Sequence, residues 1–261
     1  MFADVDTGVD DAMALVYLLA SPEADLVRIA STGGNVAVDQ VCVNNLGLLE
    51  LCGATDIPVS RGAPGPLACA MRTAEDTHGP AGLGYAELPP SGRGLTEYDA
   101  AQAWVRAAHD YAGTLVGLAT GPLTNLALAL RAEPALPRLL RRLVIMGGAF
   151  DYRGNTTPVA EWNISVDPEA AAEVFAAWGA AWGAQDPDHL PIMLGLNLTE
   201  HIAMTPAILA RLAVAAGTPT PAMSETDARG TRSPAASRNR RTSGMPYRSP
   251  QRSQRAVVAW P

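Results

Sequence analysis

Short apolar runs alternate along this chain with longer segments in which apolar residues recur every three or four positions. The short runs, rich in Leu, Val and Ile, are typical of buried strands, and the longer segments are typical of helices that face a core. Pro168 and Pro206 open two of the helical segments, where proline is favoured in the first turn. The pattern predicts strands at residues 26–31, 114–120, 142–146 and 191–196, and helices at residues 10–20, 38–52, 98–112, 123–131, 168–178 and 206–215.

Strands that alternate with helices predict an α/β fold, with an open, mostly parallel sheet and helices on both of its faces. A chain of 261 residues suits one large domain of this kind. Hydrophobic residues make up 48% of the chain and charged residues 17%, so the apolar side chains suffice for a sizeable core.

The periodic pattern ends near residue 216. We therefore predict an α/β domain at residues 1–216, incomplete at its C-terminal end, and a separate segment at residues 217–261. This segment is rich in Arg, Pro and Ser, and such low-complexity composition is typical of disorder. A basic arm for nucleic acid is one alternative. The abrupt change of composition favours another, a shifted reading frame that replaces the C-terminal part of the domain.

Charge, hydropathy and cysteine content narrow the classes of partner and compartment. A formal net charge of −7 argues against a nucleic-acid partner for the domain. No apolar run reaches the roughly 20 residues that a membrane-spanning helix requires, so no membrane partner is expected. The first residues show no basic stretch followed by an apolar one, and Cys42, Cys52 and Cys69 lack metal-type spacing. These features predict a cytoplasmic protein with reduced thiols.

Glycine and polar residues follow several of the predicted strands. In open parallel sheets, ligands bind outside the carboxyl ends of the strands, and glycine lets the backbone approach a ligand closely. Four such strand ends in one chain indicate a binding site at that edge of the sheet rather than turns alone. They comprise residues 6–8, 31–35, 120–122 and 146–148.

A cluster of aspartates marks the first of these strand ends. Asp4 and Asp6 alternate with Val5, so both carboxylates share one face of the strand. Asp10 and Asp11 then open the following helix, where the helix macrodipole also favours acidic residues. The macrodipole does not account for Asp4 and Asp6. Carboxylates this close repel one another unless a cation lies among them, and Ca²⁺ or Mg²⁺ prefers such oxygen ligands.

This stretch, Asp-Val-Asp-Thr-Gly-Val-Asp-Asp, resembles the N-terminal motif of the inosine–uridine preferring nucleoside hydrolase family. The resemblance continues in the same order and spacing to about residue 215. It includes Gly33-Gly34-Asn35, His78-Gly-Pro-Ala-Gly-Leu-Gly84, Ala119-Thr-Gly-Pro-Leu-Thr-Asn-Leu-Ala127, Met146-Gly-Gly-Ala149, and Asn155 followed by Glu161-Trp-Asn163-Ile-Ser-Val-Asp167.

The family resemblance implies hydrolysis of the N-glycosidic bond of ribonucleosides to ribose and free base. It implies a Ca²⁺ ion held by the carboxylates of Asp6 and Asp11 and by the backbone carbonyl of Thr120. It also implies that Asp10 is the general base for a Ca²⁺-bound water, with Asp4 as a supporting residue behind the cluster. These roles suit the reaction, because positive charge develops on the ribose and a metal ion lowers the pKa of its water.

The resemblance further implies how the substrate is held and how the protein assembles. The ribonucleoside would contact Asn35, Asn155, Glu161 and Asn163 through its ribose, and His78 would lie near it on a mobile loop. The family also implies a homodimer or homotetramer. Taken singly, Asn35 and Asn155 are equally typical of turns, and Glu161 and Asn163 are typical of helix caps.

Two departures from the family pattern leave other functions open. The family has a late His-Asp pair, in which the histidine serves the leaving group and the aspartate binds Ca²⁺. In this chain the last histidine is His201, and Asn197 stands where the family usually has aspartate. An inactive truncated member, or a pseudoenzyme that binds nucleoside or Ca²⁺, is therefore the alternative. A haloacid dehalogenase-like phosphatase is disfavoured, because the chain has no lysine to steady a phosphoryl group.

Overall fold

A computed structural model of the chain describes residues 1–183 and 186–215. The Arg-, Pro- and Ser-rich segment predicted at residues 217–261 lies outside the described residues. The chain divides into two compact units, one of residues 1–203 and one from residue 204 onward. Helix α10 (Pro206–Ala215) belongs to the second unit and has the predicted bounds. The elements below belong to the first unit.

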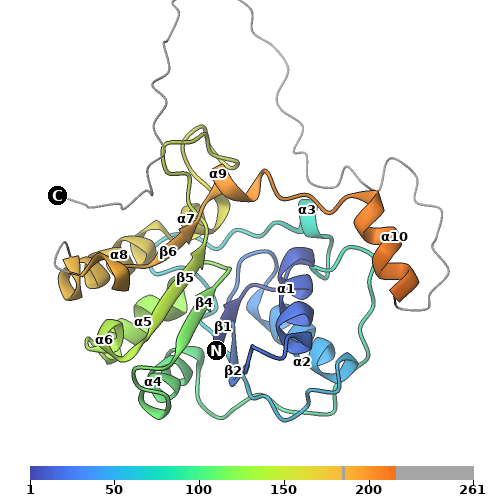
Figure 1. The fold of residues 1–261 in the computed structure, drawn as a ribbon, viewed down its shortest axis with the longest axis horizontal. Coiled ribbons are helices and arrows are strands. Elements are labelled where there is room, and N and C mark those ends of the chain that lie inside the picture. Colours follow the sequence, from blue (N-terminus) through green and yellow to red (C-terminus); the bar gives the residue numbers. More distant parts are fainter. Residues whose placement is uncertain (184–185, 216–261) are drawn as a thin grey trace, which may run out of the picture. The chain divides into compact units, whose positions relative to one another are not determined.

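Six parallel strands form the sheet, in the order β3-β2-β1-β4-β5-β6 (Figure 1). The strand order changes direction between β1 and β4, which lie side by side at the centre. In open α/β sheets, ligands bind outside the carboxyl ends of the strands at such a point. The strands are β1 (Phe2–Val5), β2 (Arg28–Ser31), β3 (Val59–Arg61), β4 (Val116–Ala119), β5 (Arg142–Met146) and β6 (Ile192–Leu194).

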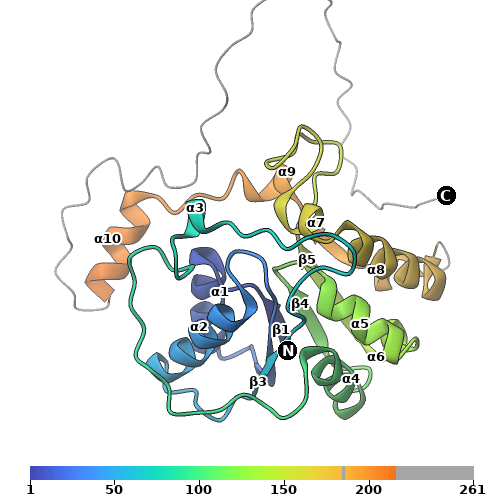
Figure 2. The ribbon, with the colours of Figure 1, turned by 180° about the vertical axis from the view of Figure 1, so that it is seen from behind.

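Helices cover both faces of the sheet (Figures 1 and 2). One face carries α1 (Val9–Ala20) and α2 (Val38–Leu51), and the other carries α4 (Ala100–Asp110), α5 (Thr124–Ala132) and α8 (Pro168–Ala181). This layering confirms the predicted α/β class. The shorter elements are α3 (Glu75–His78), α6 (Leu136–Leu139), α7 (Trp162–Val166), α9 (Leu196–Thr199) and the 3₁₀ helix η2 (Pro187–His189).

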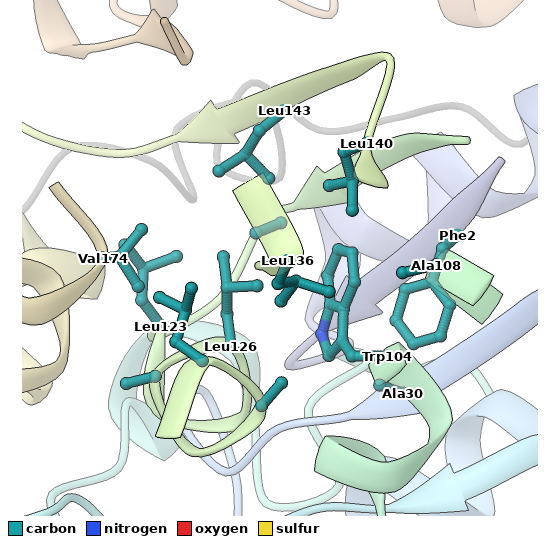
Figure 3. Packing of buried hydrophobic residues seen from close by; sticks show 14 of the residues in the cluster. Phe2, Ala30, Trp104, Ala108, Leu123, Leu126, Leu136, Leu140, Leu143 and Val174 are labelled. Atoms are coloured by element: carbon teal, nitrogen blue, oxygen red, sulfur yellow. The ribbon is translucent and has the colours of Figure 1, made fainter. Parts of the chain in front are cut away.

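Strand β1 divides the core into two layers, because its side chains alternate between the faces of the sheet. Phe2 packs against Trp104 of α4, with ring centroids 4.0 Å apart (Figure 3). Ala3 packs on the opposite face in a cluster that includes Leu15 of α1. Asp4 again faces α4, and its carboxylate accepts a hydrogen bond from the Trp104 indole at 2.7 Å. The central strand is therefore buried on both faces, as is usual in parallel sheets.

The predicted strands and long helices agree with the structure except for small differences at their ends. The sequence pattern missed β3, because Val59 is its only apolar residue. It also missed α3, α6, α7 and α9, which are too short for a helical period to be visible. No helix within the described ranges is long and apolar enough to cross a membrane.

Candidate active site

The carboxyl ends of β1 and β4 bring three of the predicted site residues together. Asp6, just after β1, and Asp11, in the first turn of α1, are both buried. Asp11 Oδ1 accepts a hydrogen bond from the hydroxyl of Thr120, the residue that follows β4. Asp11 Oδ2 accepts one from the backbone N–H of Gly8 at 2.8 Å and so caps α1. One carboxylate thus joins the start of a helix to the centre of the sheet.

Asn35 approaches the same aspartates from the loop after β2. Its backbone N–H donates to Asp6 Oδ2 at 2.9 Å, and its side-chain amide donates to Asp11 Oδ2 at 3.2 Å. Asn35 is itself buried, so this amide faces the cluster rather than solvent. Three loops, each following a central strand, therefore converge on Asp6 and Asp11.

Asp10 differs from its neighbours because its side chain is 69% exposed. Its Oδ1 lies 4.0 Å from Nδ1 of His78. Burial lowers the pKa of His78, although the charge of Asp10 opposes this shift. Its Nδ1 accepts a hydrogen bond from the backbone N–H of Val9 at 3.3 Å, which requires that this nitrogen carry no proton. An exposed carboxylate beside two buried ones is open to a water molecule or a ligand.

Burial makes the two inner aspartates hard to ionise. The pKa of Asp6 is raised well above its ordinary range, mainly by desolvation and to a smaller extent by the charge of Asp11. The pKa of Asp11 is raised to about 7, mainly by desolvation and to a smaller extent by the charge of Asp10. The hydrogen bond from Thr120 acts in the opposite direction and lowers this pKa. Among the described residues, Asp6 Oδ1 is buried without a hydrogen-bond partner. An unpaired carboxylate oxygen beside a second buried carboxylate is an environment that a hard cation would stabilise.

The oxygen donors at this edge are of the kind that hard divalent cations prefer. Within the ranges 1–183 and 186–215, no group of three or more His, Cys, Asp or Glu side chains is arranged to hold a metal ion. The predicted ligand set is smaller than that, since it consists of the carboxylates of Asp6 and Asp11 and the carbonyl of Thr120. This carbonyl accepts a hydrogen bond from Asn163 Nδ2 at 2.7 Å and retains a second lone pair.

Glycines allow the backbone to pass close to these side chains. A Cβ atom at Gly34 would lie 2.2 Å from Asp6 Oδ2, and one at Gly121 would lie 2.9 Å from Asp6 Cγ. A Cβ atom at Gly8 would lie 2.5 Å from the side-chain amide of Asn35 and 2.6 Å from Nδ1 of His78. The loops could not close around the aspartates with larger residues at these positions.

Glu161 and Asn163 lie at the ends of β4 and β5, where they bond to backbone groups. Glu161 caps α7 by accepting hydrogen bonds from two N–H groups of its first turn, and it also accepts one from Gly148 N–H at 3.0 Å. The helix-cap interpretation is thus correct for Glu161. The amide of Asn163 donates to the carbonyls of Thr120 and Met146 and so joins the two strand ends.

Asn155 is not brought into this cluster. It is exposed, and its side-chain oxygen accepts a hydrogen bond from the neighbouring Thr156 hydroxyl at 3.2 Å. No hydrogen bond among the described residues joins it to the aspartates.

Asp4 was expected to support the cluster from behind, and two of its partners, Trp104 and Asn125, were not singled out in the sequence. Asp4 accepts hydrogen bonds from the Trp104 indole at 2.7 Å, from the Asn125 amide at 3.0 Å and from the Thr32 hydroxyl. Burial raises the pKa of Asp4 to about 6, and these three bonds oppose that shift. Asn125 is buried in α5 between Thr124 and an apolar stretch of the helix, and a buried side-chain amide is usually hydrogen-bonded.

Known proteins are similar to this chain in both sequence and fold. The family model of inosine-uridine preferring nucleoside hydrolases matches residues 1–247, beyond the last motif seen in the sequence. Uridine nucleosidase 1 of Arabidopsis thaliana is 36% identical over 206 residues, which is 78% of this chain and 58% of that protein. The pyrimidine-specific ribonucleoside hydrolase RihA of Citrobacter koseri is 44% identical over 172 residues, which is 66% of this chain and 55% of that protein.

A solved plant nucleoside hydrolase, PpNRh1, has the same fold with a TM-score of 0.74 at 36% identity. The match covers 81% of this chain and 64% of that one. The chain thus spans less than two thirds of the length of each of these relatives. The motifs, the strand order and these similarities together show that this chain belongs to the inosine-uridine preferring nucleoside hydrolase family.

Proposed function

We propose that this chain hydrolyses the N-glycosidic bond of ribonucleosides to ribose and free base. Family membership supports the reaction class, as do the names of its relatives, a uridine nucleosidase and a pyrimidine-specific ribonucleoside hydrolase. The observation that carries the proposal is the cluster at the carboxyl ends of β1 and β4. There the exposed carboxylate of Asp10 stands beside the buried carboxylates of Asp6 and Asp11.

A Ca²⁺ ion would be held by Asp6, Asp11 and the backbone carbonyl of Thr120. When bound, this ion would lower the pKa of a water molecule and hold the ribose diol. The unpaired Oδ1 of Asp6 supports this assignment, because a buried carboxylate oxygen without a donor gains from a cation. The raised pKa values of both aspartates support it for the same reason.

The chain's own side chains would move the proton and hold the sugar. Asp10 would take a proton from the attacking water, since its carboxylate is exposed at the edge of the cluster. The ribose gains positive charge as the bond to the base breaks, and nearby carboxylate and amide oxygens stabilise that charge. Asn35 would bind a ribose hydroxyl from within the cluster, and His78 would contact the nucleoside from beside Asp10.

The remaining sugar contacts are assigned to Asn155, Glu161 and Asn163. Glu161 and Asn163 lie at the same edge of the sheet, and each has oxygen lone pairs left beyond its bonds to backbone groups. Asn155 is exposed and would have to move with its loop to reach the sugar. We also propose that the protein is cytoplasmic and forms a homodimer or homotetramer. Light scattering of the purified chain would test the oligomeric state.

A nucleoside-binding protein without turnover is the second candidate. Asn197 favours it, because an amide replaces the carboxylate that the family usually has at this position. Asn197 is exposed at the start of α9, after β6.

Release of ribose from a panel of purine and pyrimidine nucleosides, with Ca²⁺ and with a chelator, tests both candidates. We expect turnover that the chelator abolishes. Asp10→Asn should lower kcat by about 10²–10⁴-fold, because the general base is lost. Nucleoside binding, measured by calorimetry, should persist in this variant. The exposed Asp56→Asn is the control and should match the wild type. Binding without turnover by the wild type would favour the second candidate. If the wild type showed no binding and no turnover, both candidates would be excluded.

A further inference from the structure

Two adjacent asparagines of α2, Asn44 and Asn45, are buried beside the aspartates and have no part in the proposed chemistry. Buried side-chain amides bond to specific partners, so their partners show which segments they hold. Asn45 accepts a hydrogen bond from the Thr7 hydroxyl at 2.5 Å and donates to the Ser31 hydroxyl at 3.0 Å. It therefore joins the turn after β1, which we call the aspartate turn (residues 6–11), to the end of β2.

Asn44 joins this turn to a third segment. Its Nδ2 donates to the carbonyl of Ala81 at 2.8 Å and to the carbonyl of Thr7 at 3.3 Å. Its Oδ1 accepts a hydrogen bond from the Gln40 amide at 2.9 Å, one helical turn earlier. Both donors and the acceptor of the amide are thereby used, which fixes its orientation. A single side chain thus bonds at once to the aspartate turn and to the segment that carries His78.

The segment 78–84 is folded closely against that amide. Its ends are joined by a hydrogen bond from Gly84 N–H to the carbonyl of His78 at 2.7 Å. Gly82 has a φ of +82°, and a Cβ atom there would lie 3.2 Å from Asn44 Nδ2 and 3.1 Å from the carbonyl of Thr7. Glycine is required both for this backbone conformation and for the close approach.

We propose that Asn44 is a positioning residue, which latches the segment 78–84 onto the aspartate turn and so places His78 beside Asp10. The segment's other bond to the turn, from Val9 N–H to His78 Nδ1 at 3.3 Å, is exposed, whereas the bonds of Asn44 are buried or partly buried. Without the Asn44 donors, two backbone carbonyls lose their partner, and the segment is free to leave the turn. The effect on nucleoside affinity rests on the proposed function, whereas the attachment of the segment does not.

Hydrogen–deuterium exchange of the full chain tests the latch without any need for turnover. Asn44→Asp keeps the shape of the side chain but replaces its two N–H donors by an oxygen. We expect the amides of Gly82 and Gly84 to exchange about tenfold faster or more, because the segment opens when the donors are lost. Amides of β1 and β4 should keep their wild-type rates. The control Gln40→Ala removes the partner of Oδ1 but leaves both donors, so the segment should exchange as in the wild type.

Gly82→Ala disturbs the same contact from the side of the segment and serves if Asn44→Asp does not fold. It should give the same local increase in the exchange rate of the segment. The double variant should exchange no faster than the faster of the two single variants, because both changes break the same contact. Wild-type rates at Gly82 and Gly84 in Asn44→Asp would overturn the proposal. A uniform increase over β1 and β4 would also overturn it, since Asn44 would then only stabilise the fold.

Nucleoside affinity separates the latch from the function of the site. Calorimetry with inosine and uridine should show binding about tenfold weaker in Asn44→Asp than in Gln40→Ala, since one attachment of His78 is lost. If exchange were faster but nucleoside affinity unchanged, the proposal that Asn44 places His78 for the nucleoside would be overturned. If the wild type binds neither nucleoside, the proposed function fails, while the exchange rates still decide whether Asn44 holds the segment.

Discussion

The carboxylate of Asp6 lies so close to the backbone of Gly34 that there is no space for a side chain at position 34. Asp6 Oδ2 accepts the backbone N–H of Asn35, and the backbone of Gly34 passes directly beside it. A side chain as small as alanine at position 34 would put a carbon atom 2.2 Å from that oxygen. The carboxylate is buried between two loops and has little space to retreat, so the hydrogen bond and the cluster depend on this glycine.

Gly34→Ala should therefore lower the free energy of unfolding by about 1–3 kcal/mol, because the crowded carboxylate must shift. Urea denaturation followed by circular dichroism would measure the change. Gly92→Ala is the matched control, since a Cβ atom at Gly92 would meet nothing within 4 Å. Equal midpoints for the two variants would contradict the close approach at Gly34.

The family motifs pointed to Asp6, Asp11, Asn35 and Thr120, and the structure brings these four residues together at the carboxyl ends of β1, β2 and β4. The support of Asp4 by Trp104 could not be read in this way. The two residues are far apart in the sequence, and their hydrogen bond depends on how α4 packs against β1. The bonds of Asn44 and Asn45 were missed for the same reason, since an amide in a helix does not reveal its tertiary partner.

Among the elements, α4 and β1 are joined by both apolar and polar contacts. The Trp104 ring packs against Phe2, and its indole N–H bonds to Asp4 on the same face of the strand. Packing and hydrogen bonding therefore fix α4 at one position along β1. Long elements such as α4 could be predicted because their apolar period extends over several turns. Short ones such as β3 could not, because tertiary pairing rather than local pattern defines them.

Trp104→Phe should preserve most of the packing but leave a carboxylate oxygen of Asp4 without a donor. We expect a loss of about 1–3 kcal/mol in the free energy of unfolding, as is usual for an unpaired buried group. Trp178→Phe is the control. Trp178 is also buried, in the same core cluster, and among the described residues its indole N–H has no hydrogen-bond partner. Equal losses in thermal and urea unfolding would show that the bond to Asp4 contributes nothing beyond packing.

For the molecule as a whole, a cation at the aspartates would stabilise every element that meets there. Any ligand that binds only the native state raises stability, by about 2.7 kcal/mol at a hundred times its dissociation constant. We therefore expect the thermal midpoint to rise when Ca²⁺ is added and to fall when a chelator removes it. Asp11→Asn should abolish the difference. Identical unfolding curves for the wild type with Ca²⁺ and with chelator would contradict the assignment of the ion.

The central position of β1 has a consequence for the growing chain on the ribosome. β1 pairs in register with β2, which is complete at Ser31, and with β4, which is complete at Ala119. At a synthesis rate of about 5–20 residues per second, β1 waits roughly 5–20 s with one edge unpaired. During that interval the backbone N–H and C=O groups along this edge of β1 have no strand partner, and unpaired edges favour aggregation. Thr120 follows β4 directly, so its hydrogen bond to Asp11 can form only after the segment that closes this edge has been synthesised.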